Sequence, residues 1–169
     1  DTQPVFSPDG GTLAYLAMQV PGFEADRYRI VLQPWPEGAK RVLSESWDRS
    51  PSSLAWAPDG RTIYAVASHL GQHSLFALEV ETGNVRPVVE QGTVRAIAVG
   101  PERIVLAHES LTSPTELYSV RPDGGERLTL TSLNAARLAA ARLGEPEQFT
   151  FTGAGGDRVH AYVVKPVDF

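Results

Sequence analysis

The chain has 169 residues, of which 42% are hydrophobic and 21% charged, a composition typical of a globular protein with a buried core. Its net charge of −5, without a basic stripe, gives no reason to expect nucleic acid as a partner. No apolar run has the length that a membrane span needs. The absence of cysteine excludes disulfides, thiol catalysis and thiolate metal sites.

The most informative feature is a strand–turn–strand phrase that occurs twice. Residues 6–15 (FSPDGGTLAY) and 56–65 (WAPDGRTIYA) each place an aromatic before a Pro-Asp-Gly turn and a threonine at the start of an alternating apolar strand. Proline presets φ early in a turn, aspartate can bond its own backbone, and glycine accepts positive φ. Because all three signals recur in register, with the turn prolines 50 residues apart, the phrase is a structural repeat.

Each copy continues as a meander of short strands separated by turn residues. A third copy is degenerate, because the residues GPER at 100–103 replace the Pro-Asp-Gly turn. Pro101 follows Pro58 by 43 residues, close to the length of a four-stranded propeller blade. After a strand that ends at Phe6, the expected strands are 12–15, 28–32, 40–43, 53–56, 62–67, 74–80, 85–89, 94–99, 104–107, 116–120 and 126–130.

This pattern predicts an all-β fold, a partial β-propeller of about three four-stranded antiparallel blades. The alternative is an antiparallel sandwich built from the same hairpins, which the period, the meander order and the in-register turns disfavour. Small propellers have at least about four blades. We therefore expect a fragment, or a chain that completes its ring with other copies or other segments.

The sequence changes character after residue 131. Residues 134–143 are rich in helix formers, with Asn134 as an expected cap and Gly144 as an expected stop. Two strand patterns, 148–151 and 158–164, then flank a glycine-rich turn and form a hairpin that does not fit the blade template. The expected division is propeller blades at 1–131, a linker with a short helix at 132–147, and the first hairpin of a second domain at 148–169.

Candidate binding residues gather at one end of the blades. In a four-stranded meander, the links between strands one and two and between strands three and four share one rim, which holds the Pro-Asp-Gly turns. The opposite rim carries the longer and more varied loops, where function concentrates. The candidates there are Glu24, Asp26 and Arg27 for substrate, and Trp47, Asp48, Arg49, His69, Gln72 and His73 as a surface that faces another domain.

Each candidate also has a structural reading. The charges at 24–27 could form a solvated loop or a local ion pair, whereas the functional reading is a carboxylate that receives a cationic group such as a peptide amino terminus. Residues 47–49 could equally pack one blade against the next. His69 and His73 are four apart but lie across a glycine in an expected loop with no third ligand, so no metal site is predicted.

Catalytic signals are missing. His160 reads as a strand residue, and the glycines at 153–156 join two strands and do not open a helix, which disfavours a phosphate site. No Gly-x-Ser-x-Gly motif is present, and no motif pairs a serine with a histidine and an acid. We therefore predict no catalytic residue and no cofactor in this chain, and no turnover of chromogenic peptide substrates by the chain alone.

The motifs resemble a known family. The phrases at 6–10 and 56–60 look like blade hairpins of the β-propeller in the prolyl oligopeptidase family of serine peptidases, in its dipeptidyl peptidase V-like or acylaminoacyl-peptidase-like branch. Similar phrases occur in TolB-type propellers. More specific are PGFEADR at 21–27, WDRS at 47–50, Gly71-Gln72, Ser113-Pro114 ahead of Leu117-Tyr118, and the exit formed by Asn134 with its helix, 147–151 and DRVHAYVVKP at 157–166.

This resemblance implies a non-catalytic propeller segment that gates and positions short peptides for an α/β-hydrolase domain outside this chain. A full member would continue into a His-Gly-Gly-Pro loop and then a Ser, Asp and His triad, so no catalytic residue is carried over. Glu24 is the residue we expect at a peptide's amino terminus. The implied partners are the hydrolase domain and short peptides, without nucleic acid or membrane. Homo-oligomer formation stays open, and export to the periplasm or medium is favoured over a cytoplasmic location.

One alternative is a stand-alone TolB- or WD40-like propeller that serves as a protein-interaction module. A longer reading frame without any Gly-x-Ser-x-Gly would favour it.

Overall fold

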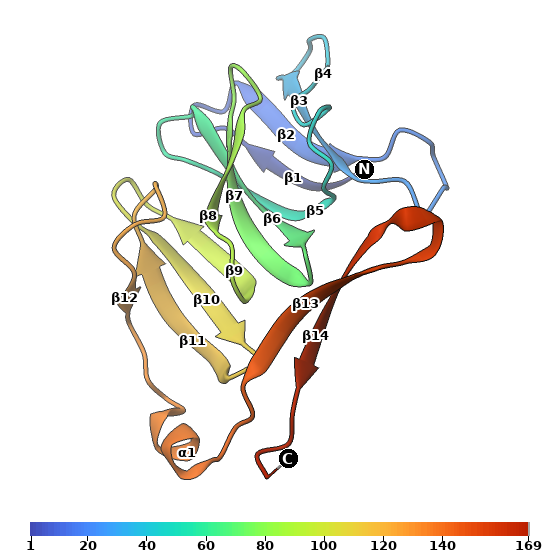
Figure 1. Cartoon of the computed structure of the whole chain (residues 1–169). Helices are drawn as coiled ribbons and strands as arrows, with labels where there is room; N and C mark the ends of the chain where they lie inside the picture. Colours follow the sequence, from blue (N-terminus) through green and yellow to red (C-terminus); the bar gives the residue numbers. More distant parts are fainter. Residues whose placement is uncertain (169) are drawn as a thin grey trace.

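A computed structural model describes residues 1–168. Among these residues, strands dominate and helix is confined to α1 (Ala135–Ala140) and a short 3₁₀ turn, Ala154–Gly156. No helix in this range is long and apolar enough to cross a membrane. The strands before α1 form three antiparallel meanders, which confirms the predicted arrangement of about three four-stranded blades (Figure 1).

The three blades have the following strands. Blade 1 comprises β1 (Thr2–Phe6), β2 (Thr12–Ala17), β3 (Arg29–Pro34) and β4 (Arg41–Val42). Blade 2 comprises β5 (Pro51–Trp56), β6 (Thr62–His69), β7 (Gln72–Glu79) and β8 (Val85–Val89). Blade 3 comprises β9 (Thr93–Val99), β10 (Ile104–Ser110), β11 (Ser113–Val120) and β12 (Leu128–Thr129).

Alternating side chains place apolar layers on both faces of blade 2. On β7, Leu78 is fully buried in a core shared with blade 1, where it joins Leu16 and Ile30. Leu75, also fully buried, lies on the other face of the same strand in a core shared with blade 3 that includes Leu106. Residues three apart on a strand face opposite ways, so blade 2 is packed from both sides.

The Pro-Asp-Gly turns have the geometry that their sequence predicts. Asp9 accepts hydrogen bonds from the hydroxyl of Ser7 (2.6 Å) and the backbone N–H of Gly11 (3.0 Å), and these bonds lower the pKa of the Asp9 carboxyl. Gly10 has a φ of 72°, the left-handed region that glycine enters without strain. In the second copy, Asp59 accepts from the N–H of Arg61 (2.9 Å).

Two expected loops are tight hairpins instead. The segment predicted as a loop before residue 74 continues both strands, with His69 paired to Gln72 and only Leu70 and Gly71 between them. Both turn residues have positive φ, 51° and 80°, the combination that matches the twist of a two-residue hairpin. The expected loop at 108–115 is corrected in the same way, since β10 reaches Ser110 and β11 starts at Ser113.

The expected helix is shorter than predicted, and only its start agrees with the sequence, because Asn134 occupies the N-cap position of α1. Asn134 precedes α1 but makes no capping bond with its side chain; instead its amide donates to Glu116 (3.0 Å). The helix ends at Ala140, with extended backbone at Ala141, so Gly144 does not terminate it. The Asn134 side chain thus binds Glu116 of blade 3 and does not cap the helix.

The exit hairpin, β13 (Pro146–Thr152) and β14 (Arg158–Val164), forms a two-stranded sheet of its own and does not join a blade. Figure 1 shows it in red beside the blades. Its pairing places Gln148 opposite Tyr162 on one face and Phe149 opposite Ala161 on the other. The hairpin is therefore two-faced: Gln148 and Tyr162 contact the propeller, while Phe149 and Phe151 remain about half exposed on the other face.

Candidate functional site

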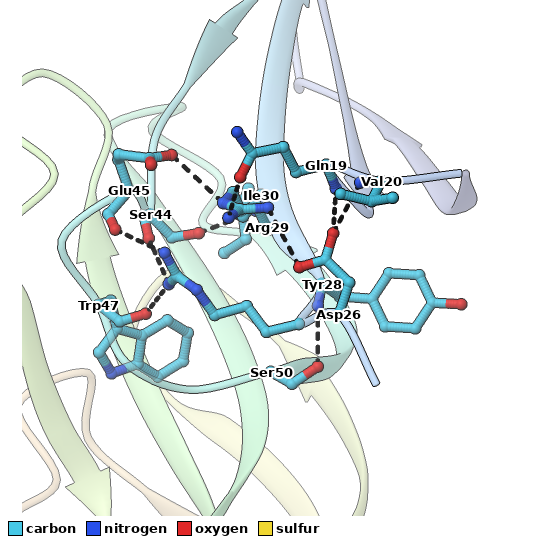
Figure 2. A network of polar contacts seen from close by, with 11 residues as sticks. Gln19, Val20, Asp26, Tyr28, Arg29, Ile30, Ser44, Glu45, Trp47 and Ser50 are labelled. Atoms are coloured by element: carbon cyan, nitrogen blue, oxygen red, sulfur yellow. Dashed lines mark hydrogen bonds and ion pairs between the residues drawn. The ribbon is translucent and has the colours of Figure 1, made fainter. Parts of the chain in front are cut away.

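The candidate site is the loop rim, the blade end that carries the β2–β3, β6–β7 and β10–β11 links and the crossovers between blades. Its longest link runs from β2 to β3 and contains Glu24, Asp26 and Arg27. Asp26 closes this loop on itself, because its carboxylate accepts the backbone N–H groups of Gln19 (2.6 Å) and Val20 (2.8 Å) (Figure 2). The hydrogen bond from Val20 is the main cause that lowers the pKa of Asp26.

Arg27 ties the same loop to the crossover between blades 1 and 2. Its guanidinium donates to the carbonyls of Ser44 (3.1 Å), Glu45 (2.7 Å) and Trp47. The backbone N–H of Tyr28 donates to the hydroxyl of Ser50 (3.0 Å) further along the crossover. The planar guanidinium, with its five donors, is suited to hold several carbonyls at once.

Arg29, the first residue of β3, is a further charged residue of this site and is not among the candidates predicted from the sequence. Its side chain is only 13% exposed and lies between two carboxylates, 3.6 Å from Asp26 and 3.3 Å from Glu45. It also donates to the Gln19 side chain (2.7 Å). An arginine among the apolar residues of a strand, three positions after an aspartate, is the sequence signal that could have identified it.

Glu24 differs from its two charged neighbours. It is exposed, and among residues 1–168 it makes no hydrogen bond or ion pair with another side chain. Phe23 and Val20 beside it are 55% and 51% exposed. The loop therefore presents a carboxylate next to apolar surface, while Asp26 and Arg27 hold the loop in place.

The next three candidates, residues 47–49, have separate roles. The Trp47 ring packs edge-on against Phe76 in blade 2, with the centroids 5.1 Å apart, so it contributes to blade packing. The Asp48 side chain is 99% exposed and lies 3.5 Å from Arg49. Arg49 donates to Nδ1 of His69 (3.1 Å), which connects the crossover to the end of β6.

The β6–β7 hairpin separates its two histidines. His69 pairs with Gln72, whereas His73 pairs with Ser68, so the two histidine side chains point to opposite faces of the hairpin. The His69 ring packs against Phe76, with the centroids 5.7 Å apart. Over the described range, no three His, Cys, Asp or Glu side chains form a group that could hold a metal ion.

Gln72 is the candidate that contacts the exit hairpin. Its side-chain amide donates to the hydroxyl of Tyr162, and its carbonyl oxygen accepts from the N–H of Gly92 (2.7 Å). Tyr162 also donates to the carbonyl of Leu70 (2.9 Å). The hairpin thus lies on the loop rim at blade 2.

Two buried titratable groups of blade 3 were missed from sequence. Glu116 is 5% exposed and accepts from the hydroxyl of Thr131 and from the N–H of Asn134 (2.8 Å). These bonds hold the pKa of Glu116 at about 2.

The second of these groups is His108, which is paired across the sheet with Glu116. It lies between the Gln91 carbonyl (2.7 Å) and Arg127 (3.1 Å). Burial lowers the pKa of His108.

The loop rim exposes both charged and apolar side chains. Within residues 1–168, no serine hydroxyl hydrogen-bonds to a histidine, so this range contains no hydrogen-bonded serine–histidine pair of the kind used in nucleophilic catalysis. What the rim offers includes an accessible carboxylate, Glu24, on a loop that internal ion pairs and hydrogen bonds fix, and the exposed Asp48 in the crossover between blades 1 and 2, together with the anchored exit hairpin.

No family model matches the sequence, but individual proteins do. Dipeptidyl-peptidase 5 of Schizosaccharomyces pombe is 31% identical over 99% of this chain and 25% of its own length. Dipeptidyl-peptidase 5 of Porphyromonas gingivalis is 28% identical over 100% of this chain and 25% of its own length. The chain therefore spans about a quarter of the length of the curated relatives it matches.

Solved structures show the same fold. Acylaminoacyl peptidase of Pyrococcus horikoshii superposes on 94% of this chain and 24% of its own with a TM-score of 0.76 and 19% identity. Dipeptidyl peptidase 4 of Porphyromonas gingivalis covers 98% of this chain and 24% of its own with a TM-score of 0.68 and 19% identity. The β-propeller domain of the trilobed protease from Pyrococcus furiosus covers 75% of this chain and 36% of its own with a TM-score of 0.60 and 19% identity. Over its whole length, this chain is thus similar to a segment of prolyl oligopeptidase-family peptidases, and its three blades have the fold of their propeller domains.

Proposed function

We propose that this chain is the non-catalytic propeller segment of a serine dipeptidyl or acylaminoacyl peptidase. In this role the loop rim gates and positions short peptides for an α/β-hydrolase domain encoded outside residues 1–169. The observation that carries the proposal is the extent of the match, which runs through 99% of the chain in a relative named dipeptidyl-peptidase 5 and includes the exit hairpin. The proposed division is propeller residues at 1–131, a linker at 132–147 and the first hairpin of the hydrolase domain at 148–169, although β13 already starts at Pro146.

The two-faced exit hairpin supports the proposed domain partner. Phe149 and Phe151 are 46% and 50% exposed on the face that points away from the blades. An isolated two-stranded hairpin is marginal in water and needs a further layer on its apolar face. A hydrolase domain would supply that layer and leave the opposite face, with Tyr162, toward the propeller.

Glu24 is the proposed ligand for a peptide amino terminus. An ammonium group next to a carboxylate forms a charge-assisted hydrogen bond, which is stronger than a neutral one. Asp26 and Arg27 would act indirectly, because their bonds to Val20 and Ser44 fix the loop that carries Glu24. The exposed Phe23 beside it would contact the first side chain of the peptide.

The stand-alone propeller has weaker support. A putative TolB from Agrobacterium tumefaciens superposes with a TM-score of 0.64 and 19% identity on 78% of this chain. The likeness to acylaminoacyl peptidase covers 94%. A propeller module alone gives no reason for the exit hairpin, whereas a two-domain peptidase does.

The test is a kinetic comparison in the full-length protein from the same gene. Glu24→Gln should raise KM for chromogenic dipeptides with a free amino terminus by about tenfold with little change in kcat, as expected for loss of one charged hydrogen bond. N-acylated substrates should be unaffected. Glu37→Gln is the matched control, since Glu37 is exposed in the β3–β4 link on the opposite rim. Equal kinetics for Glu24→Gln and the parent would reject the role of Glu24, and absence of serine-peptidase activity in the full-length protein would reject the proposal.

A further inference from the structure

The hydrogen bonds between the exit hairpin and the propeller all lie at the β6–β7 turn within the described range. Tyr162 on β14 donates its hydroxyl to the Leu70 carbonyl (2.9 Å) and accepts from the Gln72 amide. Gln148 on β13 reaches the same Leu70 carbonyl at 3.4 Å. These are the only hydrogen bonds between the hairpin and the blades within the described range, and no ion pair there joins them.

The ring of Tyr162 also packs on the same turn. A Cβ atom at Gly71 would lie 2.6 Å from Cε2 of Tyr162, well inside van der Waals contact. Gly71 therefore serves two purposes, because its φ of 80° closes the two-residue turn and its missing side chain leaves room for the ring. The close contact and the hydroxyl bonds fix both the distance and the direction of Tyr162.

The turn is also held by hydrogen bonds to the crossover between blades 2 and 3. Gln72 accepts from the N–H of Gly92 (2.7 Å), and the N–H of His73 donates to the Gly92 carbonyl (3.0 Å). His73 also pairs with Thr93, which joins β7 to β9 in a parallel bridge. The hairpin is thus tied, through one turn, to the junction between blades 2 and 3.

We infer that Tyr162 is a positioning residue, the pivot on which the exit hairpin and the chain after it are set over the loop rim. α1 contributes no buried residue, so the linker between Asn134 and the hairpin adds little support. The contacts of Tyr162 fix the orientation of β14. They therefore also fix the distance between the loop rim and the residues that follow Val164. Any effect of Tyr162 on peptide entry rests on the function proposed above. The positioning of the hairpin by Tyr162 does not depend on that function.

The test measures where the hairpin lies in this chain, without any enzymatic assay. The sequence contains no cysteine, so Glu81→Cys in blade 2 and Ala154→Cys in the hairpin, both at exposed positions, give two unique spin labels for electron–electron distance measurement. Tyr162→Phe should raise the fraction of molecules in which the exit hairpin has left the β6–β7 turn by roughly three- to tenfold. Loss of about one net hydrogen bond implies a change of this size. The matched control is Tyr28→Phe, since the Tyr28 hydroxyl has no hydrogen-bond partner in residues 1–168.

A second pair of variants tests the contact between the Tyr162 ring and Gly71. Gly71→Ala and Gly10→Ala place the same side chain at similar positive φ, 80° and 72°, but a Cβ at Gly10 meets no atom within 4 Å. Gly71→Ala should displace the hairpin, and Gly10→Ala should leave the label distance unchanged. Parental distance distributions in Tyr162→Phe, or equal distributions in the two alanine variants, would overturn the proposal.

Discussion

The carboxylate of Glu116 accepts both the backbone N–H (2.8 Å) and the side-chain amide (3.0 Å) of Asn134. This pair joins the third strand of blade 3 to the residue directly before α1. Together with Thr131, which donates its hydroxyl to the other carboxylate oxygen, it fixes the point at which the chain leaves the propeller. The exit is therefore anchored twice, at Glu116 where it begins and at the turn of blade 2 where Tyr162 binds.

Glu116→Gln should loosen the start of the exit segment. Glutamine keeps the size of the side chain but replaces one acceptor oxygen with an N–H₂ group, which faces donors and cannot accept from them. Amide hydrogen exchange at Asn134 and in α1 should become faster, while exchange in blade 1 stays unchanged. Glu102→Gln, at an exposed turn of the same blade, is the control. Unchanged protection at Asn134 in Glu116→Gln would contradict the anchor.

Glu116 should also make stability depend on acid. Its pKa is about 2 in the folded protein against an ordinary value of 4.5, so the unfolded chain binds the proton more readily and stability rises with pH in this interval. The contribution is fully present above pH 4.5 and is lost as the pH falls from there to about 2. Acid titrations of thermal unfolding should show a shallower loss in Glu116→Gln than in the parent.

His108 should act in a different pH window. Burial lowers the pKa of its imidazole, and the neutral ring accepts from Arg127 while it donates to the Gln91 carbonyl. Since the unfolded chain takes up the proton first, this contribution is present above the ordinary pKa of 6.5 and is lost as the pH falls below it. His108→Gln should flatten the pH dependence of the melting temperature between about pH 7 and 5. His73→Gln, at an exposed position, should keep the parental slope.

Much of the fold could be predicted from the sequence, because repeated turns report local backbone geometry. Asp9 and Gly10 specify their turn through bonds within a few residues, so the pattern and the structure agree. At Leu70-Gly71 the sequence predicts a loop where the structure has a hairpin, because the polar strand ends do not alternate clearly. Glu116 was missed for a different reason: its partners lie 15 and 18 residues away, and no local pattern shows which strand position will meet the linker.

Arg27 should be important for stability as well as for the loop that carries Glu24. Arg27→Met keeps the apolar stem but removes the donors to the carbonyls of Ser44 and Trp47, which should lower the free energy of unfolding by on the order of 2 kcal/mol. Arg61→Met is the matched control, because Arg61 is exposed in the Pro-Asp-Gly turn of blade 2. Equal denaturation midpoints for the two variants would show that the carbonyl contacts contribute nothing.

The two faces of blade 2 offer a matched pair of core variants. Leu78 and Leu75 lie on the same strand, both with 0% exposure, but Leu78 packs toward blade 1 and Leu75 toward blade 3. Each leucine-to-alanine change should cost about 2–5 kcal/mol, since it leaves a cavity that its neighbours fill only in part.

The location of the damage should differ between the two, because each blade packs only against its neighbours, as the units of a repeat protein do. Leu78→Ala should lower hydrogen-exchange protection first in β2 and β3, where Leu16 and Ile30 lose their contact, and Leu75→Ala first in β10, around Leu106. If both variants lowered protection equally in all three blades, the blades would unfold as one cooperative unit, and the two interfaces would have no separate stability.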